Sequence, residues 1–232
     1  MTPETTTASA RETELVDAVA QGAAEKASTA QDFQREYEQR VRDIMGSDRA
    51  QTLSPELMRQ LEDRKVLFRR ALKDAGHARL ENHAPNVGGT NTLSGGTDNM
   101  TLNRNMVAAV RDEKSAEEMG IVVAHENGHG EARELRGTLV LPQLREKVHG
   151  DIQELMQEGW AEAYANRKMG KSLDFHRTGQ PDKVYRQGHD LMLDLMRKTS
   201  WQDVEELMTS GNLHAFQKKM LTKNPDALAL AA

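Results

Sequence analysis

The sequence predicts a mainly α-helical protein of the α+β class, with N-terminal helices, a small mixed β-sheet and a helical C-terminal subdomain. Apolar residues recur at helical spacing through residues 28–85 and again from residue 115 onward. Residues 84–104 are rich in glycine, proline, threonine and asparagine, which interrupt helices. Within that stretch, residues 98–103 alternate polar and apolar side chains, as a half-buried strand does. This segment is one of very few strand candidates, so the predicted sheet is small.

Residues 1–27 contain few large apolar side chains, and we expect them to form a flexible arm that is partly helical at best. Residues 28–85 form the predicted N-terminal helical region. Its first helix opens with the capping pattern Ser28–Gln31 and ends at Gly46, and its second begins at Ser54-Pro55. The apolar stripes of these two helices are Phe33, Tyr37, Val41 and Ile44, and Leu57, Leu61, Phe68 and Leu72.

The composition limits the kinds of site and partner. The 232 residues include eight histidines and no cysteine, so a metal site must use His, Asp or Glu. The net charge of −5 argues against a dedicated nucleic-acid binder. No segment approaches the roughly 20 apolar residues of a membrane span, so we expect no membrane insertion. The first residues lack the pattern of a secretory signal, so we expect a cytoplasmic protein, or one exported without a conventional signal peptide.

The motif with the clearest chemistry lies in a helix that is predicted to open at Ser115. It reads His125-Glu126-Asn127-Gly128-His129, which is the pattern H-E-x-x-H. Residues four apart share one face of a helix, so His125 and His129 could bind one metal ion. Glu126 projects beside that ion, where it could reach a bound water. A helix with ordinary surface histidines is the alternative.

A third metal ligand is expected on the next helix, because zinc hydrolases bind their ion through three protein groups. This helix is predicted over residues 151–170, and Glu158 and Glu162 share one of its faces. Such a pair suits one metal ligand and one carboxylate that orients a metal-bound histidine. An ordinary solvated pair of glutamates is the alternative, and His149, in the loop between the helices, is the competing third ligand.

Both motifs resemble those of the gluzincin metallopeptidases, the H-E-x-x-H plus Glu class with thermolysin-like and aminopeptidase-N-like catalytic domains. The second helix of that class commonly reads E-G-x-A-E, and residues 158–162 match all four fixed positions. The resemblance implies a Zn²⁺ ion bound by His125, His129 and Glu158. It also implies that Glu162 supports a zinc ligand. The match covers roughly residues 98–222, and we expect the zinc metallopeptidase domain to span residues 86–222, followed by a C-terminal tail over 223–232.

A further segment, Tyr185-Arg186-Gln187-Gly188, resembles the Tyr-x-x-Gly helix start of aminopeptidase-N-like enzymes. The resemblance implies that Tyr185 hydrogen-bonds the developing oxyanion. A tyrosine that only packs at a helix start is an equal alternative. His189 and His176 are weaker candidates for the same role.

Taken together, the resemblance implies a zinc-dependent metalloendopeptidase that hydrolyses peptide bonds through a metal-activated water, with Glu126 as the general base. The strand lacks the glutamate with which related aminopeptidases bind the substrate amino terminus, so an endopeptidase is favoured. We expect this strand to be a sheet edge packed on the H-E-x-x-H helix, where a protein or peptide substrate could add as an extra strand. The expected substrate-binding residues are Met100, Thr101, Leu102 and Asn103.

Other functions stay open at this point. One is a catalytically silent zinc-binding or protein-interaction module on a gluzincin scaffold, because a fold does not fix a function. Another is a helical interaction protein with incidental histidines. The polar N-terminal region also resembles that of secreted bacterial effector or toxin-type proteases, whose expected partners are an inhibitor or a secretion chaperone. A housekeeping cytoplasmic peptidase fits almost as well.

Overall fold

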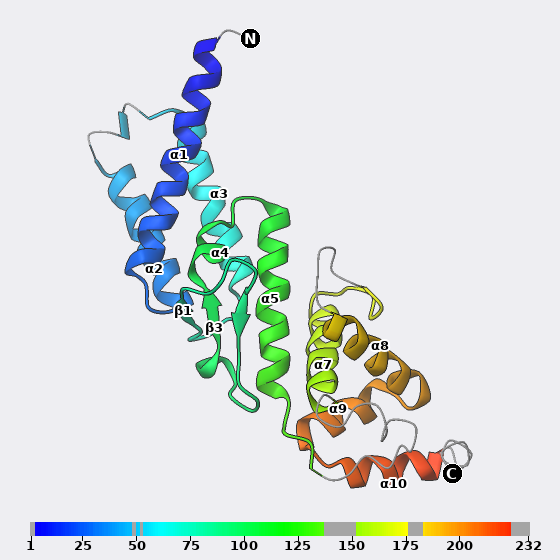
Figure 1. Ribbon diagram of the computed structural model, residues 1–232. Coiled ribbons are helices and arrows are strands. Elements are labelled where there is room, and N and C mark those ends of the chain that lie inside the picture. Colours follow the sequence, from blue (N-terminus) through cyan, green and yellow to red (C-terminus); the bar gives the residue numbers. More distant parts are fainter. Residues whose placement is uncertain (1–2, 48–49, 52, 137–151, 176–182, 224–232) are drawn as a thin grey trace. The chain divides into compact units, whose positions relative to one another are not determined.

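The chain forms a mainly helical fold with one small mixed sheet, as the sequence predicts (Figure 1). The computed structural model describes residues 3–47, 50–51, 53–136, 152–175 and 183–223. The chain divides into two compact units, residues 1–91 with 97–123 and residues 92–96 with 124–232, which are described separately. Among the described residues, no helix has the length and apolar character needed to cross a membrane.

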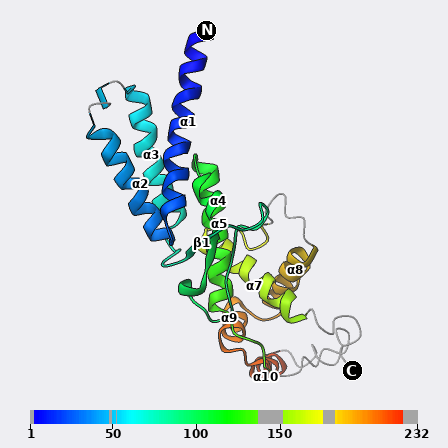
Figure 2. The same ribbon diagram turned by 60° about the vertical axis from the view of Figure 1, so that its left-hand side comes forward.

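The first unit is built on three helices that lie side by side, α1 (Pro3–Lys26), α2 (Ala30–Met45) and α3 (Pro55–Ala71) (Figures 1 and 2). The Thr29 hydroxyl caps α2 by accepting the Asp32 N–H, one residue beyond the predicted cap. The Ser54 hydroxyl caps α3 by accepting the Leu57 N–H at 3.0 Å. Both helices therefore begin within two residues of their predicted starts.

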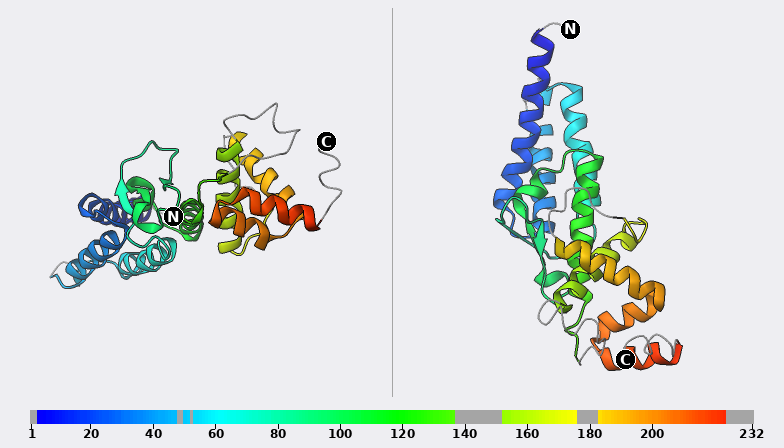
Figure 3. Two further views of the ribbon diagram at one scale, coloured as in Figure 1. Left: turned by 90° about the horizontal axis from the view of Figure 1, so that it is seen from below. Right: turned by 45° about the vertical axis from the view of Figure 1, so that its right-hand side comes forward.

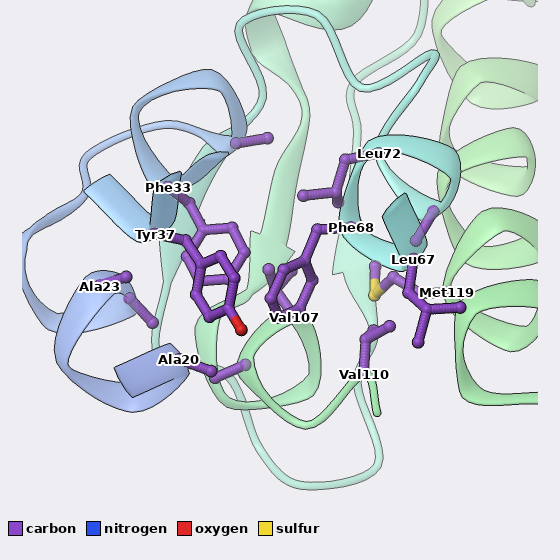
Figure 4. Close-up of a cluster of buried hydrophobic side chains, with 14 of the residues drawn as sticks. Ala20, Ala23, Phe33, Tyr37, Leu67, Phe68, Leu72, Val107, Val110 and Met119 are labelled. Carbon is purple, nitrogen blue, oxygen red and sulfur yellow. The ribbon is translucent and has the colours of Figure 1, made fainter. Parts of the chain in front are cut away.

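The core of the first unit contains an aromatic cluster of Phe33, Tyr37 and Phe68 (Figure 4). The Phe68 ring meets the other two edge-to-face, with centroid separations of 4.7 and 4.9 Å. Val107 and Met119 belong to the same buried cluster. The core therefore joins residues from both sides of the predicted boundary at 85/86.

Helix α1 corrects the expectation of a flexible arm over residues 1–27. The helix extends from Pro3 to Lys26, and its described buried residues are small. Small side chains let helices approach closely, and the Arg40 guanidinium donates to the Gly22 carbonyl oxygen at 2.8 Å across this contact. A search for large apolar residues misses such a face. Among the residues of α1 whose side chains are described, 12–26, the buried ones are Val16, Val19, Ala20, Ala23 and Ala24.

The sheet contains β1 (Arg79–Glu81), β2 (Gly89–Thr90) and β3 (Thr101–Asn103) in the order β1-β3-β2. Strand β3 pairs in parallel with β1 and antiparallel with β2. The expectation of an edge strand at residues 100–103 is therefore wrong, because β3 is the central strand. Its side chains are also buried on both faces. The partner strands have only three and two residues, which is too short for a recognisable alternation.

The second unit contains the C-terminal part of α5 (Glu113–Glu131) and the helices α7 (Ile152–Lys168), α8 (Lys183–Lys198), α9 (Trp201–Ser210) and α10 (Leu213–Lys223) (Figure 3). Helices α7 and α8 pack most extensively. The Ser200 hydroxyl caps α9, and Gly211, with φ of +67°, ends it. This unit confirms the predicted helical C-terminal subdomain. Its most buried core residues include Met156, Trp160, Met192, Leu207 and Met208.

Candidate metal centre

Helix α5 carries the H-E-x-x-H motif without a break. It opens with a reciprocal capping box, in which Asp112 Oδ1 accepts the Ser115 N–H at 2.7 Å and Ser115 Oγ accepts the Asp112 N–H at 3.0 Å. The helix therefore begins at Glu113, two residues before the predicted start. The His125 and His129 rings lie on one face, with centroids 4.8 Å apart.

The structure brings Glu158 of α7 to this pair of histidines. Its Oε2 atom lies 3.3 Å from His125 Nε2 and 3.4 Å from His129 Nε2. The two Nε2 atoms are 3.1 Å apart. The three atoms therefore form a nearly equilateral triangle, which the chain builds from two helices.

The triangle fits the requirements of a tetrahedral metal ion. Zinc bonds to nitrogen and oxygen of about 2.0–2.2 Å place ligand atoms about 3.3–3.6 Å apart, close to the observed separations. Glu158 Oε2 is buried, and no described residue donates a hydrogen bond to it. When both Nε2 atoms are deprotonated, as metal binding requires, the three atoms are all acceptors, and at these distances they repel one another unless a cation lies among them. The cluster of His125, His129 and Glu158 could therefore hold a metal ion.

In the metal-free chain, a proton takes the place of that cation. Burial lowers the pKa of His125, but the nearby carboxylates, chiefly those of Glu158 and Glu162, outweigh this effect and raise it to about 9. Burial raises the pKa of Glu158, but the two histidines outweigh this effect and lower it to about 2. A metal ion that binds at neutral pH must therefore displace a proton from the cluster.

Two further glutamates of the motifs accompany the triangle. Glu162 is 2% exposed, and its Oε1 lies 3.2 Å from His125 Nδ1, although without the angle of a regular hydrogen bond. It therefore stands behind the histidine, where a carboxylate orients a metal ligand. Glu126 is 7% exposed, and its charge contributes to the raised pKa of His125.

Tyr185 of α8 also reaches the cluster, with its ring centroid 5.7 Å from that of His125. Helix α8 can do so because it crosses α7 at Gly159 and Gly188. A Cβ atom built on either glycine would overlap a backbone oxygen of the opposite helix. The glycine of E-G-x-A-E and that of Tyr-x-x-Gly are thus the two sides of one close helix contact. In this contact, Gly159 follows Glu158 directly in the sequence, and Gly188 lies one helical turn after Tyr185.

Other predicted site residues have different surroundings. His189 is buried, and its Nε2 lies 2.6 Å from the Leu173 carbonyl oxygen. The ring nitrogen that would donate to an oxyanion is therefore engaged with this carbonyl. His149 and His176 lie outside the described residues. Residues 100–103 belong to the first unit, so their substrate-binding role stays a prediction.

Sequence reasoning missed the packing roles of three residues near the centre. Gly159 and Gly188 permit the close contact of α7 and α8. Asn166 joins α7 to the segment that follows it, because its side-chain amide donates to the Phe175 carbonyl oxygen at 2.8 Å. Asn166 stands one helical turn after Glu162, on the same face of α7. The spacing of Glu158, Glu162 and Asn166 could have indicated this role, since three polar residues on one face of a largely apolar helix need hydrogen-bond partners.

Comparison with known proteins adds no relative. No family model matches the sequence, and neither the curated proteins nor the solved structures contain a match. The interpretation of the centre therefore rests on its geometry and on the resemblance of its motifs.

Proposed function

We propose that this chain is a zinc-dependent endopeptidase whose centre is formed by His125, His129 and Glu158. The supporting observation is the convergence of three metal-ligating atoms within 3.4 Å of one another. A buried glutamate, Glu126, adjoins the first histidine in the helix. When bound, a zinc ion supplies a Lewis acid and lowers the pKa of a water to about 7.

Glu126 acts as the general base in this proposal. Its carboxylate takes a proton from the attacking water and passes it to the departing amine as the peptide bond breaks. Its burial limits competition from bulk water. Glu126 is not one of the three converging ligands, so its proposed role differs from theirs.

Tyr185 and Glu162 have supporting roles in this proposal. The Tyr185 phenol donates a hydrogen bond to the oxyanion that develops on the scissile carbonyl. The position of its ring beside His125 supports this role. Glu162 places its carboxylate 3.2 Å from His125 Nδ1, and its charge orients the imidazole with Nε2 as one corner of the ligand triangle.

The substitution Glu126→Gln tests this function. We expect the variant to retain one zinc per chain and to lose peptide cleavage by at least about 100-fold, because glutamine cannot accept the proton. The matched control is Glu131→Gln, an exposed glutamate near the end of the same helix, which should leave cleavage unchanged. Cleavage is measured by mass spectrometry on a mixed-sequence peptide library, and zinc by elemental analysis. Retained cleavage in Glu126→Gln would refute the mechanism, and zinc without cleavage in the unmodified chain would identify a silent binding module.

A further inference from the structure

Trp160 stands between Glu158 and Glu162 in the sequence, but its side chain hydrogen-bonds to the backbone of α5 and not to the ring nitrogens of the two histidines. The residue is fully buried in the core of the second unit. Its indole N–H donates a hydrogen bond to the Gly128 carbonyl oxygen at 3.1 Å. Gly128 immediately precedes the metal-ligating His129, so the bond joins the two helices at the level of the centre.

The backbones of α5 and α7 are unusually close at this point. A Cβ atom on Gly128 would lie 2.8 Å from the Cα atom of Ala161, a distance that real Cβ atoms essentially never show. The Gly128 carbonyl oxygen also accepts the Ala132 N–H at 3.1 Å, which is its regular helical bond. The Trp160 indole therefore uses the second acceptor position of that oxygen.

The metal ligands require a defined register between these helices, because α5 supplies both histidines and α7 supplies Glu158. Glycine at 128 permits the close approach, but it does not determine the position of one helix along the other. A directional hydrogen bond from α7 to one carbonyl of α5 does determine this register. Trp160 is two residues from Glu158, so the bond and the ligand share one turn of α7.

We propose that Trp160 is a positioning residue of the metal centre, whose indole N–H sets the register at which His129 and Glu158 meet one ion. The inference rests on the proposed metal site and not on peptidase activity. A group of this kind acts through the ligands, and its loss typically weakens metal binding by about 10–100-fold.

The second tryptophan of the chain provides a matched control. Trp201 is partly buried at the edge of the same core, and its ring centroid lies 5.1 Å from that of Trp160. Its indole N–H is buried, and it has no hydrogen-bond partner among the described residues. The substitutions Trp160→Phe and Trp201→Phe make the same chemical change to two side chains that touch each other, but only Trp160→Phe removes a hydrogen bond to α5.

The experiment compares Co²⁺ binding to the unmodified chain, Trp160→Phe and Trp201→Phe, by visible absorption and chelator competition. We expect Trp160→Phe to raise the Co²⁺ dissociation constant by about 10–100-fold and to change the absorption bands. Trp201→Phe should stay within about threefold of the unmodified chain. An unchanged constant in Trp160→Phe, or an equal rise in both variants, overturns the inference. If the unmodified chain does not bind Co²⁺, the metal-site proposal falls together with it.

A measurement on the unmodified chain keeps the inference testable if Trp160→Phe does not fold. The chain contains two tryptophans, so its two indole N–H signals can be followed by NMR during a Zn²⁺ titration. We expect the Trp160 signal to shift and to exchange more slowly when zinc is bound, because the ion draws α5 and α7 together, whereas the Trp201 signal should change little. A Trp160 signal that neither shifts nor gains protection overturns the inference.

Discussion

Substituting Gly188 with alanine will force helices α7 and α8 apart. The new Cβ atom would lie 2.9 Å from the Gly159 backbone nitrogen and closer still to the Leu155 carbonyl oxygen. Real Cβ atoms essentially never approach within 3.0 Å of such atoms, so the backbones must separate by roughly 1 Å. Overpacking of this kind typically costs about 1–3 kcal/mol of unfolding free energy. The variant should therefore fold with a lower melting temperature.

This separation should affect catalysis more than metal binding. Tyr185 moves with α8, whereas the three proposed ligands lie on α5 and α7. A displacement of about 1 Å at a catalytic group can cost about 100-fold in rate. We expect Gly188→Ala to lower kcat by about 10–100-fold and to leave the zinc dissociation constant within about threefold.

A double-mutant cycle with Tyr185→Phe separates positioning from general damage. If Gly188 acts through Tyr185, Gly188→Ala should cause little further loss of kcat in the Tyr185→Phe background. The control is Met192→Ala, which removes buried bulk from the same helix without forcing the helices apart, and which should lower stability but spare kcat. Equal losses in both backgrounds, or a large loss of zinc affinity in Gly188→Ala, would refute the reasoning.

Two further predictions concern the charges of the centre. The raised pKa of His125 stabilises the metal-free chain fully below pH 6.5, and this contribution is lost as the pH rises toward 9. The melting temperature of the metal-free chain, measured by circular dichroism, should therefore fall between pH 6.5 and 9. Glu158→Gln should reduce this fall but not abolish it, because Glu162 still raises the pKa of His125. An equal fall in that variant would contradict the assignment. Glu162→Gln should raise the zinc dissociation constant about 10-fold, because a neutral amide holds His125 less firmly. Chelator competition measures the constant, and no change would count against a supporting role for Glu162.

The parts of the molecule that depend on local sequence could be predicted. The cap at Ser54 and the spacing of His125 and His129 follow from contacts within a single helix. Glu158 was predicted by its motif, and the structure places it 3.3–3.4 Å from both histidines. These features need only the geometry of one helix or a pattern within five residues.

The parts that depend on close packing between elements could not be predicted. Helix α1 buries alanines such as Ala20 and Ala23, which carry little hydrophobic signal. The central position of β3 depends on two partner strands of two and three residues. The crossing at Gly159 and Gly188 depends on two different helices, so neither glycine alone indicates its partner.

The existence of the metal centre is tested most directly by the zinc content of the purified chain. Elemental analysis after extensive dialysis should find about one zinc per chain in the unmodified protein. The substitution His129→Ala removes one of three ligands and should reduce the content to below about one tenth of that value. A chain without zinc that also fails to take up added Zn²⁺, or equal zinc in both proteins, would contradict the centre formed by His125, His129 and Glu158.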